Sequence, residues 1–316
     1  MKASQTHEGA SPHVAILLAT YNGARYLGEQ LDSIGRQTHG NWTVWASDDG
    51  STDGTLDLLV RYRERWGADR LVIVSGPGRG FVANFLNLVC DAGINADYFA
   101  FCDQDDVWES DKLERAIAAP CKMPAQTPVL YCGRTRLVNA ENAPVGFSPL
   151  MRYRPSFENA LVQSIAGGNT MVFNRAARKL LAAAGASVCV PVHDWWAYLL
   201  ISGCGGIIIY DPCPTVRYRQ HGTNIIGGNS GWATRYQRLM MLVKGQFAEW
   251  SESNFKALSS IRDCLTPANR AAMERFAAVR QMGFFARTAG FVRLRIYRQT
   301  WRGNLALIAG IVLKRI

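Results

Sequence analysis

The chain has 316 residues, of which 48% are hydrophobic and 19% charged, so its composition excludes a disordered protein. This length allows one large domain or two ordinary ones. The net charge of +10 is unevenly placed, because residues 1–230 hold 20 Lys+Arg and 21 Asp+Glu whereas residues 231–316 hold 15 and 4. The basic excess predicts an anionic partner for the last quarter, either a membrane or a nucleic acid.

The eight cysteines are scattered and form no CxxC pair, which argues against a structural zinc site. Several lie inside apolar runs, where a reduced cysteine acts as a small hydrophobic residue, and this favours a reducing cytosol. The polar stretch Met1–Pro12 lacks the apolar segment that a signal peptide needs. We therefore expect a cytoplasmic protein.

Short apolar runs alternate with amphipathic segments through the first third of the chain, as in strand–helix units. Strands are predicted at Val14–Thr20, Thr43–Ser47, Leu71–Val74 and Tyr98–Cys102. Helices are predicted at Ala24–Gln37, from an N-cap at Asp53 to about Trp66, and at Phe81–Cys90. Repeated units of this kind predict an α/β fold with a mostly parallel central sheet and right-handed crossovers.

After Pro120 the pattern mixes strands and helices, as an α+β extension of the same sheet would. Strands are predicted at Pro128–Val138, Thr170–Phe173 and Ile207–Tyr210, and helices at Glu158–Ile165, Arg175–Ala184 and His193–Ser202. From about Trp232 onward only helices are predicted, so we expect a helical C-terminal extension.

Polar clusters follow three of the predicted strands, at Thr20–Gly23, Asp48–Ser51 and Asp103–Asp106. Because ligands bind at the carboxyl ends of strands in an open α/β sheet, we expect these clusters to converge at one edge. An Asp after the second strand could accept the N3–H of a uracil or thymine ring. The alternative for Asp48–Ser51 is a turn followed by a helix cap.

The cluster Asp103–Asp106 places three carboxylates after a buried apolar strand. These groups repel one another and lose hydration, so a hard divalent cation is expected to compensate their charge. The alternative is a solvated acidic loop, or the acidic first turn of the next helix.

In this order and spacing, the motifs resemble those of the family 2 glycosyltransferases with the GT-A nucleotide-diphospho-sugar transferase fold, over about residues 12–225. The resemblance is carried by Val14–Gly23, Gln37-Thr38, Asp48–Asp53 and Asp103–Asp106. It is strongest to bacterial rhamnosyltransferase-type enzymes, on account of Gly167–Thr170, His193–Trp196 and Tyr218–Gly222. In the broader family the first position of the His193-Asp194 pair is more often Glu.

The resemblance implies that Asp49 binds the base, while Thr20, Tyr21 and Asn22 line the nucleotide pocket. Asp103 and Asp105 would position the ribose, the diphosphate and a Mg²⁺ or Mn²⁺ ion. His221 matches a further metal or diphosphate contact, and Arg79 is a candidate diphosphate contact. Without the resemblance, His221 is an ordinary hydrogen-bonded loop histidine.

The resemblance also implies that Asp194 is the general base of an inverting single displacement. Trp195 and Trp196 would form an apolar wall beside this carboxylate and stack on a sugar ring. Asp106, Gly168 and Asn169 would lie beside the sugar or the acceptor. The alternatives are core packing for the tryptophans and a helix N-terminal carboxylate for Asp194.

The implied organisation is a nucleotide-sugar half at residues 12–115, an acceptor half at 116–230 and a basic helical extension at 231–316. The implied reaction transfers a sugar, rhamnose being favoured, from a dTDP- or UDP-linked donor to a surface-glycan or lipid-linked hydroxyl. Alternatives are a UDP-hexose enzyme of the same fold and a non-catalytic glycan- or membrane-binding relative. A dehydrogenase or a nucleotidyltransferase is disfavoured, because no glycine-rich phosphate loop follows the first strand.

The last segment, Gln281–Ile316, interleaves arginines with aromatic and aliphatic residues and holds no acidic residue. Its longest apolar run, Leu305–Leu313, is too short to cross a bilayer but could lie on one. We expect a peripheral site on the inner face of the cell membrane, with plain packing on the core as the alternative. Nucleic-acid binding is not expected, because no recognised module accompanies the charge.

Overall fold

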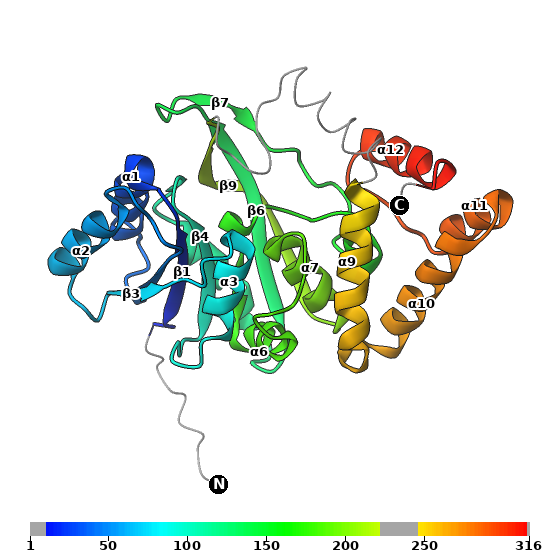
Figure 1. Cartoon of the computed structure of the whole chain (residues 1–316), viewed down its shortest axis with the longest axis horizontal. Coiled ribbons are helices and arrows are strands. Elements are labelled where there is room, and N and C mark those ends of the chain that lie inside the picture. The colour runs from blue at the N-terminus through cyan, green and yellow to red at the C-terminus, as the bar shows by residue number, and fades with distance from the viewer. Residues whose placement is uncertain (1–10, 222–245, 315–316) are drawn as a thin grey trace, which may run out of the picture.

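The structure of the protein, a computed structural model, describes residues 11–221 and 246–314 (Figure 1). These residues form a mixed sheet with the strand order β3-β2-β1-β4-β8-β6-β9-β5, and β7 also pairs with β6. The strands are β1 (Val14–Thr20), β2 (Trp42–Asp48), β3 (Leu71–Ser75), β4 (Tyr98–Asp103), β5 (Val107–Trp108), β6 (Val129–Val138), β7 (Pro144–Phe147), β8 (Val172–Asn174) and β9 (Ile207–Arg219).

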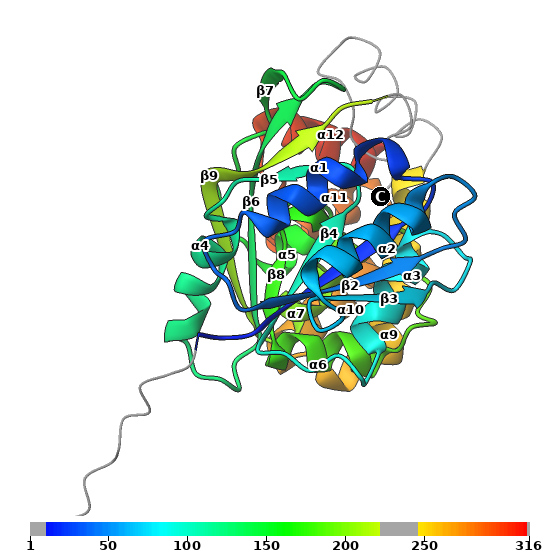
Figure 2. The same ribbon diagram turned by 90° about the vertical axis from the view of Figure 1, so that its left-hand side faces the viewer.

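Helices cover both faces of the sheet (Figures 1 and 2). Residues 11–221 contain α1 (Ala24–Gly35), α2 (Thr55–Trp66), α3 (Phe81–Cys90), α4 (Lys112–Ala118), α5 (Phe157–Ala160), α6 (Arg175–Ala184) and α7 (His193–Gly203). The C-terminal part contains α9 (Gln246–Ser260), α10 (Pro267–Gln281), α11 (Phe284–Arg293) and α12 (Trp301–Val312). Short 3₁₀ turns lie at Pro120–Lys122, Gly168–Thr170 and Arg262–Cys264.

Strand β1 is the centre of the parallel half, with β2 on one side and β4 on the other. All seven of its residues are buried, because its alternate side chains enter two different cores. One core packs the sheet against α1, α2 and α4, and the other packs it against α3, α6 and α7. This explains why the strand reads as a continuous apolar run.

The second half of the sheet is mixed. Strand β8 pairs antiparallel with β4 and β6, whereas β6 and β9 pair in parallel. Strand β9 extends to Arg219, well beyond the predicted end at Tyr210, and its pairing with β6 is irregular between Gly133 and Thr135. The parallel arrangement predicted for the repeated strand–helix units therefore describes β1 to β4.

The C-terminal helices join the core that contains α7. Phe276 of α10, Phe291 of α11, and Leu307 and Ile311 of α12 are buried members of this core. The extension is thus part of the folded body, at the end of the molecule opposite α2 (Figure 1).

Several predicted boundaries differ from the structure. Helix α5 ends at Ala160 and not at Ile165, and the strand after Gly167 begins only at Val172 because Gly168–Thr170 form a 3₁₀ turn. The N-cap of α2 is Gly54, while the Asp53 carboxylate accepts hydrogen bonds from the backbone N–H groups of Thr55 and Ala24. The short strands β5 and β7 were not predicted.

All eight cysteines are free. Over the two described ranges, every helix is too short or too polar to span a bilayer. The predicted onset of helices at Trp232, and Gly222 of the Tyr218–Gly222 motif, lie outside the described residues.

Candidate functional site

The ends of β1 and β2 are joined through Asp48. Thr20 pairs with Asp48 in the parallel register, and its hydroxyl donates to Asp48 Oδ1 at 2.9 Å. The other Asp48 oxygen accepts from the backbone N–H groups of Gly50 and Ser51, at 3.2 and 2.9 Å. Asp48 therefore shapes the turn, as the alternative for this cluster proposed, and leaves Asp49 to project from it.

Asp49 lies against the loop that follows β3. Its two carboxylate oxygens accept the backbone N–H groups of Gly78 and Gly80, each at 2.7 Å. Both glycines have positive φ, at +66° and +86°, a conformation that residues with a Cβ rarely adopt. Arg79 sits exposed between them, so Asp49 and Arg79 belong to one loop cluster. Each Asp49 oxygen keeps a free lone pair for a further donor.

Gln104 connects the first and third polar clusters. Its side-chain amide exchanges two hydrogen bonds of 2.9 Å with the backbone N–H and C=O of the exposed Tyr21. A Cβ at Gly23 would lie 2.1 Å from Gln104 Oε1, so only glycine leaves room for this contact. Asn22 joins the second cluster, because it accepts from Thr52 N and donates its own N–H to Ser51 Oγ, both at 2.8 Å. The three polar clusters are therefore brought together at one edge of the sheet.

Asp103 ends β4 beside β1 and is close to two other carboxylates. Burial, together with the negative charges of Asp105 and Asp194, raises the pKa of Asp103 to about 8, although the charge of Lys112 opposes this. A bound cation would favour the ionised form of this buried carboxyl and would offset its repulsion from Asp105 and Asp194.

Asp105 and His221 form a pair across this edge. His221 Nε2 lies 2.8 Å from Asp105 Oδ2, and the imidazole ring packs on Tyr26 at 5.0 Å between ring centroids. The neighbouring Arg219 is fully buried and donates to the Asp105 backbone carbonyl at 2.9 Å and to Glu29 at 2.9 Å. Arg219 thus fixes the end of β9 to the acidic loop and to α1.

Asp106 and Asn169 are structural partners in this structure. Asp106 is fully buried, accepts from the Asn169 side-chain amide, and accepts the Arg219 backbone N–H at 3.1 Å. Burial raises its pKa well above the ordinary range, as do the charges of Asp105 and Asp103. Asp106 and Asn169, which is 3% exposed, hold the Gly168–Thr170 turn against the acidic loop, and their placement beside sugar or acceptor stays a prediction.

Asp194 lies in the first turn of α7, facing the Gly168–Thr170 turn. It accepts the Gly168 N–H at 3.1 Å. Burial raises the pKa of Asp194 to about 6, although hydrogen bonds from the backbone of Trp195 and Gly168 and from Ser164 oppose the shift. A carboxylate with this pKa is mostly ionised at neutral pH and is a stronger base than an exposed one.

The preceding residue, His193, is packed as a neutral ring. It stacks on Phe85 with ring centroids 4.1 Å apart and meets the edge of Phe101 at 4.8 Å. Burial lowers the pKa of His193 to about 3, and neither ring nitrogen has a hydrogen-bond partner among the described residues. A Cβ on Gly168 would lie 2.4 Å from His193 Nε2. His193 and Gly168 therefore pack together and hold the Gly168 N–H toward Asp194.

The two tryptophans after Asp194 do not line an open site. Trp195 is 5% and Trp196 0% exposed, and the Trp195 indole N–H donates to the Ala160 carbonyl at 2.6 Å. Stacking on a sugar requires an exposed ring face. The predicted sugar-stacking role is therefore wrong for this structure, and core packing accounts for both rings.

Lys112 was missed by sequence reasoning. It is fully buried with its Nζ 3.4 Å from the centroid of the Trp108 ring, and this Nζ has no hydrogen-bond partner among the described residues. Burial lowers the pKa of Lys112 to about 7, against the charges of Cys102, Asp106 and Asp103. The only sequence signal was its position nine residues after Asp103, which periodicity does not distinguish from a surface lysine.

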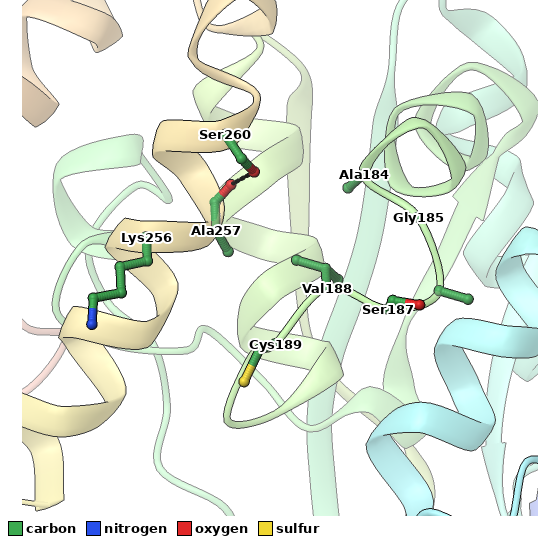
Figure 3. Close-up of a pocket in the computed structure, with 9 residues that line it drawn as sticks. Ala184, Gly185, Ser187, Val188, Cys189, Lys256, Ala257 and Ser260 are labelled. Atoms are coloured by element: carbon green, nitrogen blue, oxygen red, sulfur yellow. Dashed lines mark hydrogen bonds between the residues drawn. The ribbon is translucent and has the colours of Figure 1, made fainter.

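Within the described ranges, no three acidic, imidazole or thiol groups already surround one point as a closed metal cage. A Mg²⁺-type ion needs only one or two carboxylates when substrate phosphates supply further oxygens. A separate shallow hollow lies between the loop after α6 and helix α9, lined by Val188, Cys189 and Lys256 among others (Figure 3). It contains none of the predicted site residues.

A parallel half-sheet whose strands end in carboxylates, extended by a mixed half and faced by a carboxylate on α7, defines a GT-A glycosyltransferase. Residues 15–181 match the family model described as glycosyl transferase family 2, which is more than half of the chain. The protein belongs to this family and is a glycosyltransferase.

Three known proteins illustrate the similarity. The dTDP-rhamnosyl transferase RfbG of Shigella flexneri is 28% identical over 239 residues, which cover 70% of this chain and 78% of that protein. The solved mannosyltransferase PcManGT of Pyrobaculum calidifontis, in complex with GDP-Man and Mn²⁺, has a TM-score of 0.52 at 20% identity over 97% of this chain and 86% of that one. S. aureus TarS in complex with UDP-GlcNAc has a TM-score of 0.51 at 15% identity, over 90% and 89% of the two chains. The predicted fold class and family are confirmed.

Proposed function

We propose that this glycosyltransferase transfers rhamnose from a dTDP-linked donor to a hydroxyl of a surface-glycan or lipid-linked acceptor, with inversion and with a divalent cation. The observation that carries the proposal is the gathering of Asp103, Asp105 and Asp194 at the carboxyl end of β4, where burial, together with the charges of Asp105 and Asp194, raises the pKa of Asp103 to about 8. The similarity to RfbG supports rhamnose as the sugar.

The cation would be held by Asp105 with Asp103 and, beside them, His221. Oxygen ligands suit Mg²⁺ or Mn²⁺, and two structurally similar glycosyltransferases were solved with Mn²⁺. When bound, the ion would neutralise the charge that develops on the leaving diphosphate. Arg219 fixes the Asp105 backbone for this task, since it is fully buried and donates to the Asp105 carbonyl.

The nucleotide would lie over the loops after β1, β2 and β3. The free lone pairs of Asp49 suit the N3–H of a pyrimidine, and Arg79 in the adjoining loop suits the diphosphate. Tyr21 is exposed beside Asn22 and Gln104, so its ring is available to the base. These contacts support a pyrimidine donor, while the choice of sugar rests on the relatives.

Asp194 would remove the proton of the acceptor hydroxyl as its oxygen attacks the anomeric carbon from the face opposite the diphosphate. The Gly168 N–H at 3.1 Å, with hydrogen bonds from the Trp195 backbone and the Ser164 side chain, orients the Asp194 carboxylate for this role. A base with a pKa of about 6 is matched to this task at neutral pH.

In this proposal residues 12–115 form the donor half, 116–230 the acceptor half and 231–316 the basic extension. A cytoplasmic position on the inner face of the membrane suits a lipid-linked acceptor. The run of eight Lys/Arg without an acidic residue from Arg280 onward supports an anionic membrane surface as partner.

A donor screen by calorimetry tests the proposal, with dTDP-rhamnose, UDP-hexoses and GDP-mannose measured with and without Mn²⁺. The expected result is Mn²⁺-dependent binding that is tightest for dTDP-rhamnose. Tighter binding of a UDP-hexose would favour the alternative UDP-hexose enzyme. Donor binding of equal strength without any divalent ion would contradict the role of Asp103 and Asp105.

A further inference from the structure

Helix α12 carries apolar residues on its exposed side as well as on its buried side. Its inner face, with Leu307 and Ile311, is buried in the core. Its outer face presents a stripe at helical spacing, which we call the α12 stripe, of four large apolar residues that are 41% to 66% exposed: Trp301, Leu305, Ile308 and Val312. A helix that is apolar all round is normally buried on every side. The α12 stripe therefore matches an apolar environment outside the protein.

Helix α11 adds to this exposed apolar surface. Phe285 is 85% and Val292 74% exposed, while Phe291 on the other side of the helix is buried. The two helices lie next to each other at the same end of the molecule (Figures 1 and 2). Contiguous exposed apolar side chains of this size mark an interaction surface.

The charged residues of α11, α12 and the segments that adjoin them in sequence are all basic. Glu274 is the last acidic residue of the chain, and the exposed Arg293, Arg302 and Lys314 flank the two helices. The Arg302 guanidinium lies 5.1 Å from the Trp301 ring centroid, which places a cation beside the apolar stripe. Apolar side chains bordered by cations complement the acyl chains and anionic headgroups of a membrane.

Both helices are attached to the catalytic body through buried residues, among them Phe291 and Leu307. Arg287 of α11 is buried and donates to the carbonyls of Ile311 and Val312 at 2.8 and 3.3 Å, so it caps the end of α12. The linker before α12 is fixed by Gln299, which is 1% exposed and bonds the Tyr153 backbone in both directions. These contacts join α11 to α12, and the linker before α12 to the acceptor half.

We infer that the outer faces of α11 and α12 form the surface that docks on an anionic bilayer, with the α12 stripe inserted among the acyl chains and the arginines on lipid phosphates. This deepens the membrane partner proposed above and rests on it. At 12 residues α12 is about 18 Å long, so it lies in the interface and does not cross it.

The test is co-sedimentation of the full chain with phosphatidylglycerol/phosphatidylcholine vesicles and with phosphatidylcholine alone. The double variant Leu305→Ser/Ile308→Ser keeps the charge and should weaken binding to the mixed vesicles about tenfold or more, because half-exposed leucine-sized side chains lose their burial. Leu56→Ser/Val60→Ser is the matched control, since these α2 residues are 41% and 40% exposed at the far end of the molecule and should leave binding unchanged.

Charge is tested by Arg293→Gln/Arg302→Gln, which should lower binding about thirtyfold at low salt and much less at high salt. A measurement independent of folding defects is quenching of tryptophan fluorescence by brominated lipid, which should fall in Trp301→Phe.

Equal binding of Leu305→Ser/Ile308→Ser and the unchanged chain, or an equal loss in the α2 control, would overturn the inference. So would a concentration-dependent dimer that this variant abolishes while vesicle binding persists, because the stripe would then join two copies of the chain. If the unchanged chain binds neither vesicle, the membrane partner itself fails. Calorimetry of dTDP with Mn²⁺ reports on the transferase site separately and should be the same for all variants.

Discussion

The strand-end edge and the α11–α12 surface differ in the side chains that they present. The first holds hydrogen-bonded polar groups, and the second exposes apolar ones. At the ends of β1, β2 and β4, carboxylates and amides are tied to the backbone of neighbouring loops. On α11 and α12 the exposed positions carry Phe, Val, Trp, Leu and Ile. The first arrangement fixes charges where a ligand needs them, and the second leaves apolar area uncovered where a surface needs it. Substitutions should therefore affect turnover in one region and localisation in the other.

The largest expected effect on turnover comes from Asp194→Asn. The amide keeps the shape and can accept the Gly168 N–H but cannot take a proton, so kcat should fall about 10³-fold while donor binding stays unchanged. Steady-state kinetics and dTDP calorimetry measure the two quantities, with the exposed Asp57→Asn as control. Loss of donor binding would show that Asp194 has a structural role.

The same variant has a predicted effect on stability. Because folding raises the Asp194 pKa from 3.8 to about 6, its stabilising contribution is complete below pH 3.8 and is lost as the pH rises through 6. An amide does not ionise, so its contribution to stability does not change over this pH range. Asp194→Asn should therefore melt at the same or a higher temperature than the unchanged chain at pH 7. A clearly lower Tm would contradict the raised pKa.

Asp105→Ala should lower kcat/KM about 10²-fold and remove the effect of Mn²⁺ on nucleotide binding, because one carboxylate ligand and the His221 contact are lost together. Chelation of divalent ions should reduce the unchanged chain to a similar rate, and Asp57→Ala serves as the matched control. Normal turnover after either treatment would remove Asp105 from the metal site.

The pH profile should show a smaller effect of the same base. Asp194 acts only when ionised, so kcat/KM should rise about tenfold from pH 5 to pH 7, with an inflection near 6, and level off above it. An inflection near 4 would mean that burial does not perturb this carboxyl.

Gly168→Ala should have the smallest effect on turnover and a measurable one on stability. The new methyl would press on the His193 ring, which Phe85 and Phe101 prevent from moving, so overpacking should cost about 1–3 kcal/mol. Thermal unfolding measures the cost. Gly283→Ala is the matched control, because a Cβ there would meet nothing within 4 Å.

The parallel half of the fold could be predicted because its signals are local. Val14–Thr20, Phe81–Cys90 and Arg175–Ala184 were predicted with the observed bounds, since buried strands and amphipathic helices repeat over short distances. The strand β9 was cut short because two prolines lie inside it, and the irregular pairing with β6 that accommodates the segment is a tertiary feature.

The site was only partly predictable for the same reason. The carboxylates after β1, β2 and β4 share an edge because parallel topology dictates it. What Asp106, Trp195 and Trp196 do depends on partners far away in the chain, such as Arg219 and Ala160, and no local pattern encodes those contacts. The burial of Lys112 could not be predicted, because lysines lie mostly at the protein surface.

The clasp between Gln104 and the Tyr21 backbone couples two loops that are 83 residues apart in sequence. A nucleotide that binds at Tyr21 thus contacts a loop that is hydrogen-bonded to the loop carrying Asp103 and Asp105. Because these loops are already ordered, donor binding should cost little conformational entropy, which favours high affinity from few contacts. A larger residue at Gly23 would displace the Gln104 side chain and break these hydrogen bonds, so that each donor would have to order the two loops on binding.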